Sequence, residues 1–188
     1  IFKPQGNMVI DIGGGTTDIA ILSMGEIVTS KSLRYAGDRM NQAIVNYIKA
    51  NHQLLIGMRT AEAIKIEIGA ATDPDPDASM NVRGRDTIDG LPKQIKVNSS
   101  EVTEALQEGL QSIIDTTKQV LQETPPELSA DIIDRGIMIT GGGALLKNID
   151  KLIADSLQVP VLIAESPLES VALGTGILLQ HIEKHERH

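Results

Sequence analysis

Two stretches of this chain repeat one pattern, in which an apolar run leads straight into three glycines. The first is VIDIGGG (residues 9–15) and the second is IMITGGG (residues 137–143). Short continuous apolar runs are typical of buried strands, and glycine permits tight turns and a close approach of another molecule to the backbone. Ligands of open α/β sheets bind beyond the carboxyl ends of the strands. The repeat therefore predicts an α/β sheet whose two glycine turns belong to one site.

Hydrophobic spacing predicts the order of the remaining elements. The expected strands lie at 8–12, 19–22, 26–33, 80–85, 93–97, 136–140 and 159–164. The expected helices lie around 38–48 with Asp38 as N-cap, 61–68 ended by Gly69, 102 to near Pro125, 145–153 and 171–182. Residues 71–79 are predicted to form a loop. Three strands, a helix-rich segment and then strand–helix–strand–helix indicate an α/β chain with a subdomain inserted between about residues 35 and 99.

Composition narrows the function classes. The 188 residues are 41% hydrophobic but only 2% aromatic, so the core must consist of Ile, Leu, Val, Ala and Met. The net charge of -8 argues against binding to the phosphate backbone of a nucleic acid. Absence of cysteine excludes a disulfide framework and favours the cytoplasm, and no apolar run is long enough for a membrane span. Because the chain starts at Ile1, we expect it to be a piece of a longer protein.

The first glycine run has the residues that a metal-bound polyphosphate requires. Successive backbone N–H groups in a glycine turn form an anion-binding concavity, and the hydroxyls of Thr16 and Thr17 add donors. Asp11 would repel phosphate unless a divalent cation lay between them, so it predicts Mg²⁺. Either glycine run alone could be a plain turn, but two runs at strand ends favour a nucleotide site. The Walker pattern is absent, and GGGTTDIAIL runs into a strand rather than the helix of a Rossmann loop.

These motifs resemble a known family. DIGGGTTD resembles the second phosphate loop of the actin-like ATPase superfamily, and TGGGALL resembles its adenosine motif. Together, IGMRTAEAIKIEIG, TPPELSADIIDRG and ESPLESVALGTG resemble the MreB family of bacterial actin-like rod-shape proteins, of MreB, Mbl or MreBH type. The resemblance extends from Met8 to Leu179.

The resemblance implies an actin-like ATPase (ribonuclease H-like) fold that binds nucleotide between two large halves. This chain would be the C-terminal half alone, with a larger subdomain (1–34 plus 100–171) and an inserted smaller α+β subdomain (35–99). Residues 172–188 would form a helix that crosses back to the other half. The first phosphate loop and the acid for hydrolysis would lie in that other half. The intact protein would then be a slow ATPase, and this chain alone would lack activity and a catalytic residue.

The resemblance also implies site residues, with ATP and Mg²⁺ as cofactors. Asp11 would be the acid on the metal side. The phosphate donors would be Gly13, Gly14, Gly15 and Thr16, and the adenosine would be lined by Gly141, Gly142, Gly143, Ala144 and Leu145. Glu62 and Lys65 would reach the ribose and the adenine edge. They lie three apart on one predicted helix, although a surface ion pair would have the same spacing. Asp18 stands where the family often has Glu, and Met58 departs from the common GERTAE.

The implied function is a cytoskeletal filament that guides cell-wall synthesis and so determines rod shape. Its partners would be further copies and a RodZ-like membrane protein on the larger subdomain, with no nucleic acid and no direct membrane insertion. The intact protein would be cytoplasmic, at the inner face of the cell membrane. A sugar kinase, a heat-shock chaperone ATPase or a pure interaction module are the alternatives. The spacing of His181, His185 and His188 would suit a metal, but a solvated tail is favoured.

Overall fold

The computed structural model describes residues 6–164. In chain order the elements are β1 (Gly6–Ile12), β2 (Thr17–Ser23), β3 (Glu26–Leu33), α1 (Gly37–His52), β4 (Leu54–Leu55), α2 (Met58–Ile68), β5 (Ser79–Asp86), β6 (Pro92–Asn98), α3 (Ser99–Gln122), α4 (Pro126–Arg135), β7 (Ile137–Thr140), the 3-10 helix η1 (Gly142–Leu145), α5 (Ile149–Leu157) and β8 (Val161–Ile163). Within these residues the strands form two sheets, in the orders β3-β2-β1-β7-β8 and β4-β5-β6.

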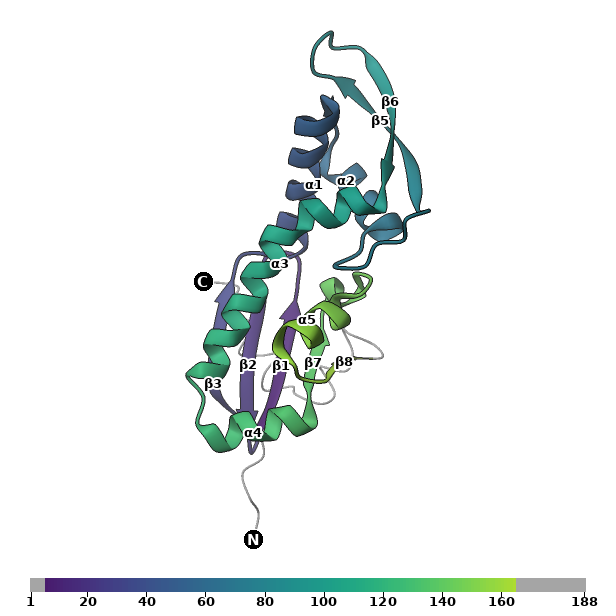
Figure 1. The fold of residues 1–188 in the computed structure, drawn as a ribbon. Coiled ribbons are helices and arrows are strands. Elements are labelled where there is room, and N and C mark those ends of the chain that lie inside the picture. The colour runs from purple at the N-terminus through teal and green to yellow at the C-terminus, as the bar shows by residue number, and fades with distance from the viewer. Residues whose placement is uncertain (1–5, 165–188) are drawn as a thin grey trace.

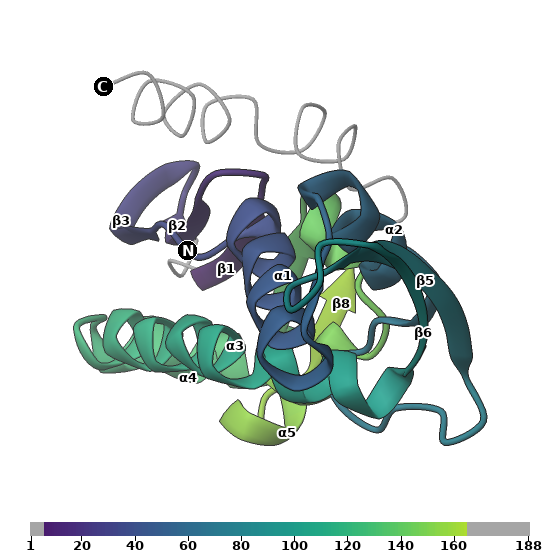
Figure 2. The ribbon, with the colours of Figure 1, turned by 90° about the horizontal axis from the view of Figure 1, so that it is seen from above.

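The larger sheet is mixed. β1, β2 and β3 form an antiparallel meander, whereas β7 pairs in parallel with β1 and β8 pairs in parallel with β7. Figure 2 shows α3, α4 and α5 on the same side of this sheet. Ile10, Ile12, Ile19 and Ile21 point from β1 and β2 into the core on that side, and each is fully buried. The core is therefore aliphatic, as the composition requires.

The smaller sheet lies at the opposite end of the molecule from α4 (Figure 1). α1 and α2 pack beside it, and Leu54, Val82 and Val97 are its buried residues. α3 is 24 residues long and extends from this sheet along the larger one, so a single helix packs against both parts of the structure. None of the helices within residues 6–164 is long and apolar enough to cross a membrane.

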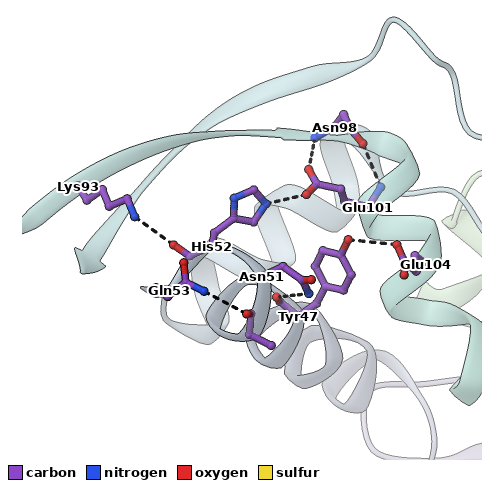
Figure 3. Close-up of polar contacts among 9 residues, drawn as sticks. Tyr47, Asn51, His52, Gln53, Lys93, Asn98, Glu101 and Glu104 are labelled. Carbon is purple, nitrogen blue, oxygen red and sulfur yellow. Dashed lines mark hydrogen bonds and ion pairs between the residues drawn. The ribbon is translucent and has the colours of Figure 1, made fainter. Parts of the chain in front are cut away.

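A cluster of polar contacts fastens the end of α1 to the start of α3 (Figure 3). The Asn98 side chain accepts the N–H of Glu101 at 3.1 Å, and the Glu101 carboxylate accepts the N–H of Asn98 at 3.0 Å. This reciprocal pair is a capping box, which stabilises the helix start. The other carboxylate oxygen of Glu101 lies 2.6 Å from Nε2 of His52, and the hydroxyl of Tyr47 donates to Glu104 at 3.1 Å. These contacts hold the two helices at a fixed angle.

Three predictions about the elements were wrong. α4 was not predicted because Pro125 and Pro126 were interpreted only as a helix stop, although proline is favoured in the first turn of a new helix. β4 was not predicted either, because its two residues are too few to show a periodic pattern. The second glycine run leads into η1 and only then into α5, whereas a helix directly after the glycines was expected. The helix predicted at 171–182 lies outside the described residues.

Gly109 in the middle of α3 permits a close contact with the chain that leads into α1. A Cβ at this position would overlap the ring of Tyr35. Tyr35 is held from two further sides, since its carbonyl accepts the hydroxyl of Thr17 at 2.6 Å and its own hydroxyl reaches the carbonyl of Leu106 at 3.5 Å. Burial raises the pKa of Tyr35 well above its usual range, so its ring stays neutral.

We expect Gly109→Ala to lower the free energy of unfolding by about 1–3 kcal/mol, because the added methyl overpacks the contact with Tyr35. Adding Tyr35→Leu to Gly109→Ala should restore part of the loss, and Glu108→Ala on the exposed side of α3 is the control. Urea unfolding of the variants measures both effects. A destabilised Gly109→Ala that the second substitution does not relieve would show that the ring is not the obstacle.

Candidate nucleotide-binding site

The two glycine runs meet at one edge of the larger sheet. β1 and β7 are parallel neighbours, with Asp11 opposite Thr140, so both strands end at the same edge. The turns are in direct contact: a Cβ on Gly141 would lie 2.5 Å from Oδ1 of Asp11, and a Cβ on Gly143 would overlap the side chain of Ile12. The predicted convergence of the two turns is therefore present in the fold.

The first glycine turn is held by its own hydrogen bonds and by the start of α1. The N–H of Gly13 donates to the carbonyl of Thr16 at 3.0 Å. The N–H groups of Gly37 and Asp38 donate to the carbonyls of Gly13 and Gly14, at 3.0 and 2.8 Å. α1 therefore directs its amino end at the turn and satisfies the turn's carbonyl oxygens, which would otherwise repel an anion.

Two N–H groups of the same turn remain available to a ligand. Within residues 6–164, no hydrogen bond engages the N–H of Gly14 or Gly15. Both residues are exposed, and neither has a positive φ. Two neighbouring N–H groups without a protein acceptor are the donors that an anion such as phosphate requires.

A cavity of about 360 Å³ lies beside the two turns, between them and α2. Its volume is in the range of small-molecule sites. Seven of the predicted site residues line it, namely Gly13, Gly14, Glu62, Lys65, Gly142, Gly143 and Leu145. Five further residues do so without having been predicted, namely Gly37, Asp38, Met40, Ile66 and Leu146. The cavity thus joins the glycine turns to the helix expected to reach the ribose.

The other predicted residues lie around the cavity rather than in its wall. Gly15 is at the exposed tip of the first turn, whereas Gly141 in the second turn and Ala144 in η1 are buried. Asp11 is half-buried beside Gly141, and the hydroxyl of Thr16 donates to the carboxylate of Asp18 at 3.0 Å. Their binding roles stay predictions.

The hydroxyl of Thr17, suggested as a phosphate donor, instead donates to the carbonyl of Tyr35. Thr17 is fully buried, so this suggestion is wrong. Its position in β2 explains the outcome, because its side chain points into the protein and must find a partner there.

Lys65 is the one lysine in the cavity wall, and its environment is unusual. The side chain is half-buried, and Nζ donates to the carbonyl of Gly37 at 3.3 Å. Burial lowers the pKa of Lys65, while the carboxylates of Glu62 and Asp38 oppose that shift. A partly desolvated cation beside the first glycine turn is well placed to interact with an anionic or polar ligand.

Asp38 was predicted only as a helix cap. The N-cap of α1 is Ala36, and Asp38 lies in the first turn, where a carboxylate is favoured by the helix dipole. Its Oδ1 lies 3.8 Å from the position that a Cβ on Gly14 would take. No local pattern of residues around Asp38 indicated this contact, because the glycine turn lies far upstream in the sequence.

The described residues contain no group of three or more His, Asp or Glu side chains able to hold a metal ion. A Mg²⁺ ion typically uses one or two carboxylates together with phosphate oxygens and water. A single carboxylate at Asp11 is compatible with this coordination, because the remaining ligands would come from the nucleotide and from water.

We expect Gly141→Ala to destabilise the protein by about 2–4 kcal/mol, because Gly141 has φ +84 and its added Cβ meets Asp11. Gly142→Ala is the matched control, since nothing lies within 4 Å of its added Cβ, and it should change stability by less than about 0.5 kcal/mol. Chemical denaturation of the two variants tests the difference. Equal losses of unfolding free energy in the two variants would contradict the claim that only Gly141 is required by the packing of the protein.

Lys65→Met should leave the protein at least as stable as the wild type at neutral pH, with a gain below about 1 kcal/mol because the charge is screened by solvent. Since folding lowers the pKa of Lys65, the unfolded chain binds more protons as the pH approaches 10.5, and wild-type stability should rise over that range. The rise should be smaller in Lys65→Met than in the exposed control Lys118→Met. Unfolding free energies between about pH 7 and pH 10 measure both slopes, and identical slopes would refute the assignment.

Comparisons with known proteins agree with this geometry. The family model described as MreB/Mbl protein matches residues 1–187. The chain is 57% identical over 184 residues to the cell shape-determining protein Mbl of Bacillus subtilis (strain 168), covering 98% of this chain and 55% of that protein. It is 47% identical over 185 residues to the cell shape-determining protein MreB of Escherichia coli (strain K12), covering 98% and 53%.

Solved structures show the same fold. The crystal structure of MreB 5 of Spiroplasma citri bound to AMPPNP has a TM-score of 0.88 and 43% identity, covering 98% of this chain and 55% of that one. The MamK double helical filament has a TM-score of 0.68 at 22% identity, covering 93% and 54%, and supports the fold alone. These neighbours confirm the predicted actin-like fold.

The chain spans about half the length of the curated relatives it matches. The comparisons do not support the narrower expectation that it is the C-terminal half alone, and they do not favour a sugar kinase or a chaperone ATPase. The match over residues 1–187 and the identity to Mbl and MreB show that this chain belongs to the MreB/Mbl family.

Proposed function

We propose that this chain forms one wall of the adenine-nucleotide site of a bacterial actin-like protein, which assembles into filaments and determines cell shape by guiding cell-wall synthesis. The observation that carries the proposal is the meeting of the two glycine turns at the ends of β1 and β7, next to a cavity that contains Lys65. Related MreB 5 structures bound to AMPPNP and to ADP support nucleotide binding.

In this proposal the first turn binds the phosphates. The N–H groups of Gly14 and Gly15 are the free donors, with Gly13 and Thr16 completing the turn. Asp11 would hold a Mg²⁺ ion through water, and the ion would neutralise phosphate charge near that carboxylate. The carbonyl groups of Gly13 and Gly14 are already engaged by α1, so they do not oppose the ligand.

The adenosine would lie on the other side of the cavity. Glu62 and Lys65 would contact the ribose and the adenine edge from α2. The second turn would provide a flat backbone surface for the purine, through Gly141, Gly142, Gly143, Ala144 and Leu145. Leu145 is 75% exposed, which is unusual for a large apolar side chain in a cavity wall and suits contact with a base.

The whole protein would hydrolyse ATP slowly, and the part of it outside this chain would supply the rest of the phosphate site. We propose that residues 35–99 form a smaller inserted subdomain and that 1–34 plus 100–171 form the larger one, with 172–188 as a helix toward the remainder. This chain alone would then bind nucleotide weakly and lack ATPase activity.

Filament assembly would proceed head to tail. The β5–β6 end and the α4 end of the chain are unlike (Figure 1). Contact between unlike ends is heterologous, and repeated heterologous contacts give an open filament when they do not close into a ring. Further copies and a RodZ-like membrane protein on the larger subdomain would be the partners, and filaments would lie at the inner face of the cell membrane.

Thermal unfolding with and without millimolar Mg-ATP tests the nucleotide site, because a ligand of the folded state raises the midpoint by mass action. We expect a rise in the wild type. Gly14→Ala should keep the unliganded midpoint, since its added Cβ makes only ordinary contact with Asp38. It should weaken binding about tenfold or more, because the methyl displaces phosphate from charge-assisted hydrogen bonds that contribute about 1.5–3 kcal/mol each.

Two further variants sharpen the test. Asp11→Asn should reduce the difference between Mg-ATP and ATP with a chelator, and Lys65→Met should weaken binding while Lys118→Met does not. An equal rise in Gly14→Ala and wild type would refute the proposed phosphate site. A wild-type midpoint that Mg-ATP leaves unchanged would refute nucleotide binding by this chain on its own.

A further inference from the structure

A second cavity, of about 640 Å³, lies between α2 and β5, which are neighbours in both Figure 1 and Figure 2. Its wall consists of Arg59, Thr60 and Ala63 of α2, with Met80, Asn81, Val82, Arg83 and Gln94 of the β5–β6 hairpin. We call it the α2–β5 groove. None of these residues lines the cavity beside the glycine turns, so the groove is a separate feature.

One wall of the α2–β5 groove is the edge of a strand. β4 pairs with β5 only through Leu54 opposite Asp86 and Leu55 opposite Arg85. Beyond that point β5 has β6 on one side, and on its other side the groove separates it from α2. Within residues 6–164, no backbone hydrogen bond engages this second edge of β5 along residues 80–83.

The direction of the backbone groups follows from the neighbouring bonds. The N–H of Asp86 donates toward β6, to Leu91 at 2.8 Å, whereas the N–H of Thr87 donates toward β4, to Gln53 at 2.9 Å. Alternate residues of a regular antiparallel strand present their N–H and C=O groups to opposite edges. Counting back from Thr87 through the regular pairing of β5, Asn81 and Arg83 direct these groups into the groove.

The side chains around this edge are cationic. Arg59 and Arg83 are both exposed, and neither takes part in an ion pair within the described chain. The protein contact of the Arg83 guanidinium is a hydrogen bond from Nε to Gln94 at 3.1 Å, which leaves its other N–H groups toward solvent. No carboxylate lines the groove, although the whole chain has a net charge of -8. The groove is therefore a local cationic site on an acidic protein.

We propose that the α2–β5 groove binds an extended acidic segment of a partner protein, which adds as a strand to the free edge of β5. Main-chain hydrogen bonds to Asn81 and Arg83 would supply the register, as in other cases of strand addition. Carboxylates on alternate residues of the segment would face Arg59 and Arg83, and the polar Thr60 would complete the wall. This interaction uses none of the proposed nucleotide-binding residues.

A labelled peptide of alternating glutamate and valine is the probe, and the same peptide with lysine in place of glutamate is its control. Fluorescence anisotropy at low ionic strength should show binding of the acidic peptide alone, weakening as salt is added. Hydrogen exchange on the bound protein should show slowed exchange at the amides of Asn81 and Arg83. Binding without that slowing would mean mere charge attraction and would overturn the proposed strand addition.

Matched variants separate the backbone from the charge. Asn81→Pro removes a groove-facing N–H without changing charge or the pairing to β6, and it should weaken binding about fivefold or more, whereas Asn81→Ala should not. Arg59→Gln should weaken binding about two- to fivefold. Lys96→Gln, an exposed cation opposite Asn81 but outside the groove, should have no effect.

The remaining outcomes also decide the proposal. Equal losses of peptide affinity in Arg59→Gln and Lys96→Gln would show that the peptide does not bind in the groove, and would overturn the proposal. If Asn81→Pro proves unfolded, the exchange of the wild-type amides with and without peptide decides by itself. Slowed exchange at Asn81 and Arg83 that appears without peptide as the protein concentration rises would show that a second copy occupies the edge, and would overturn the partner proposal.

Discussion

The parallel pairing of β1 with β7 is the constraint on which the candidate site depends. Asp11 lies opposite Thr140, and because β1 and β7 are parallel, both strands end at the same edge of the sheet. Two glycine turns that are far apart in sequence thereby come into contact. The segment from α1 to α3 contributes no strand between β1 and β7 in the sheet. It can therefore place α2 across the cavity without disturbing the pairing of these two strands. The amino end of α1 then completes the arrangement by binding the carbonyls of the first turn.

The glycines of the two turns have different roles. Gly141 and Gly143 are required by the protein itself, because side chains there would collide with Asp11 and Ile12. Around Gly14, Gly15 and Gly142 the protein leaves room for a methyl group, so internal packing does not explain the absence of a side chain. This open space agrees with the proposal that a ligand approaches the bare backbone at these three positions.

Much of the fold could be predicted from the sequence, since short continuous apolar runs such as Ile19–Leu22 indicate strands and a change of period separates them from helices. α4 could not, because a proline pair permits both a stop and a new start. The convergence of the glycine turns followed from a general rule about strand ends. The place of Asp38 in the cavity wall, the engaged hydroxyl of Thr17 and the free edge of β5 depend on packing between distant segments. No local pattern of residues encodes those contacts, so the sequence alone did not reveal them.

The continuous α3 has a mechanical consequence. At 1.5 Å per residue its 24 residues form a rod about 36 Å long, which lies along both sheets. A rod has no loop in which a hinge could be placed. The contacts of Glu101 with His52 and of Glu104 with Tyr47 also fasten its first turns to the end of α1. α1 and α2 both pack against this rod, so a movement of α2 away from the glycine turns would act on it. Gly109, where the ring of Tyr35 lies against the helix, has no side chain to stiffen the rod there. Such a movement of α2 would therefore depend on how easily one helix bends.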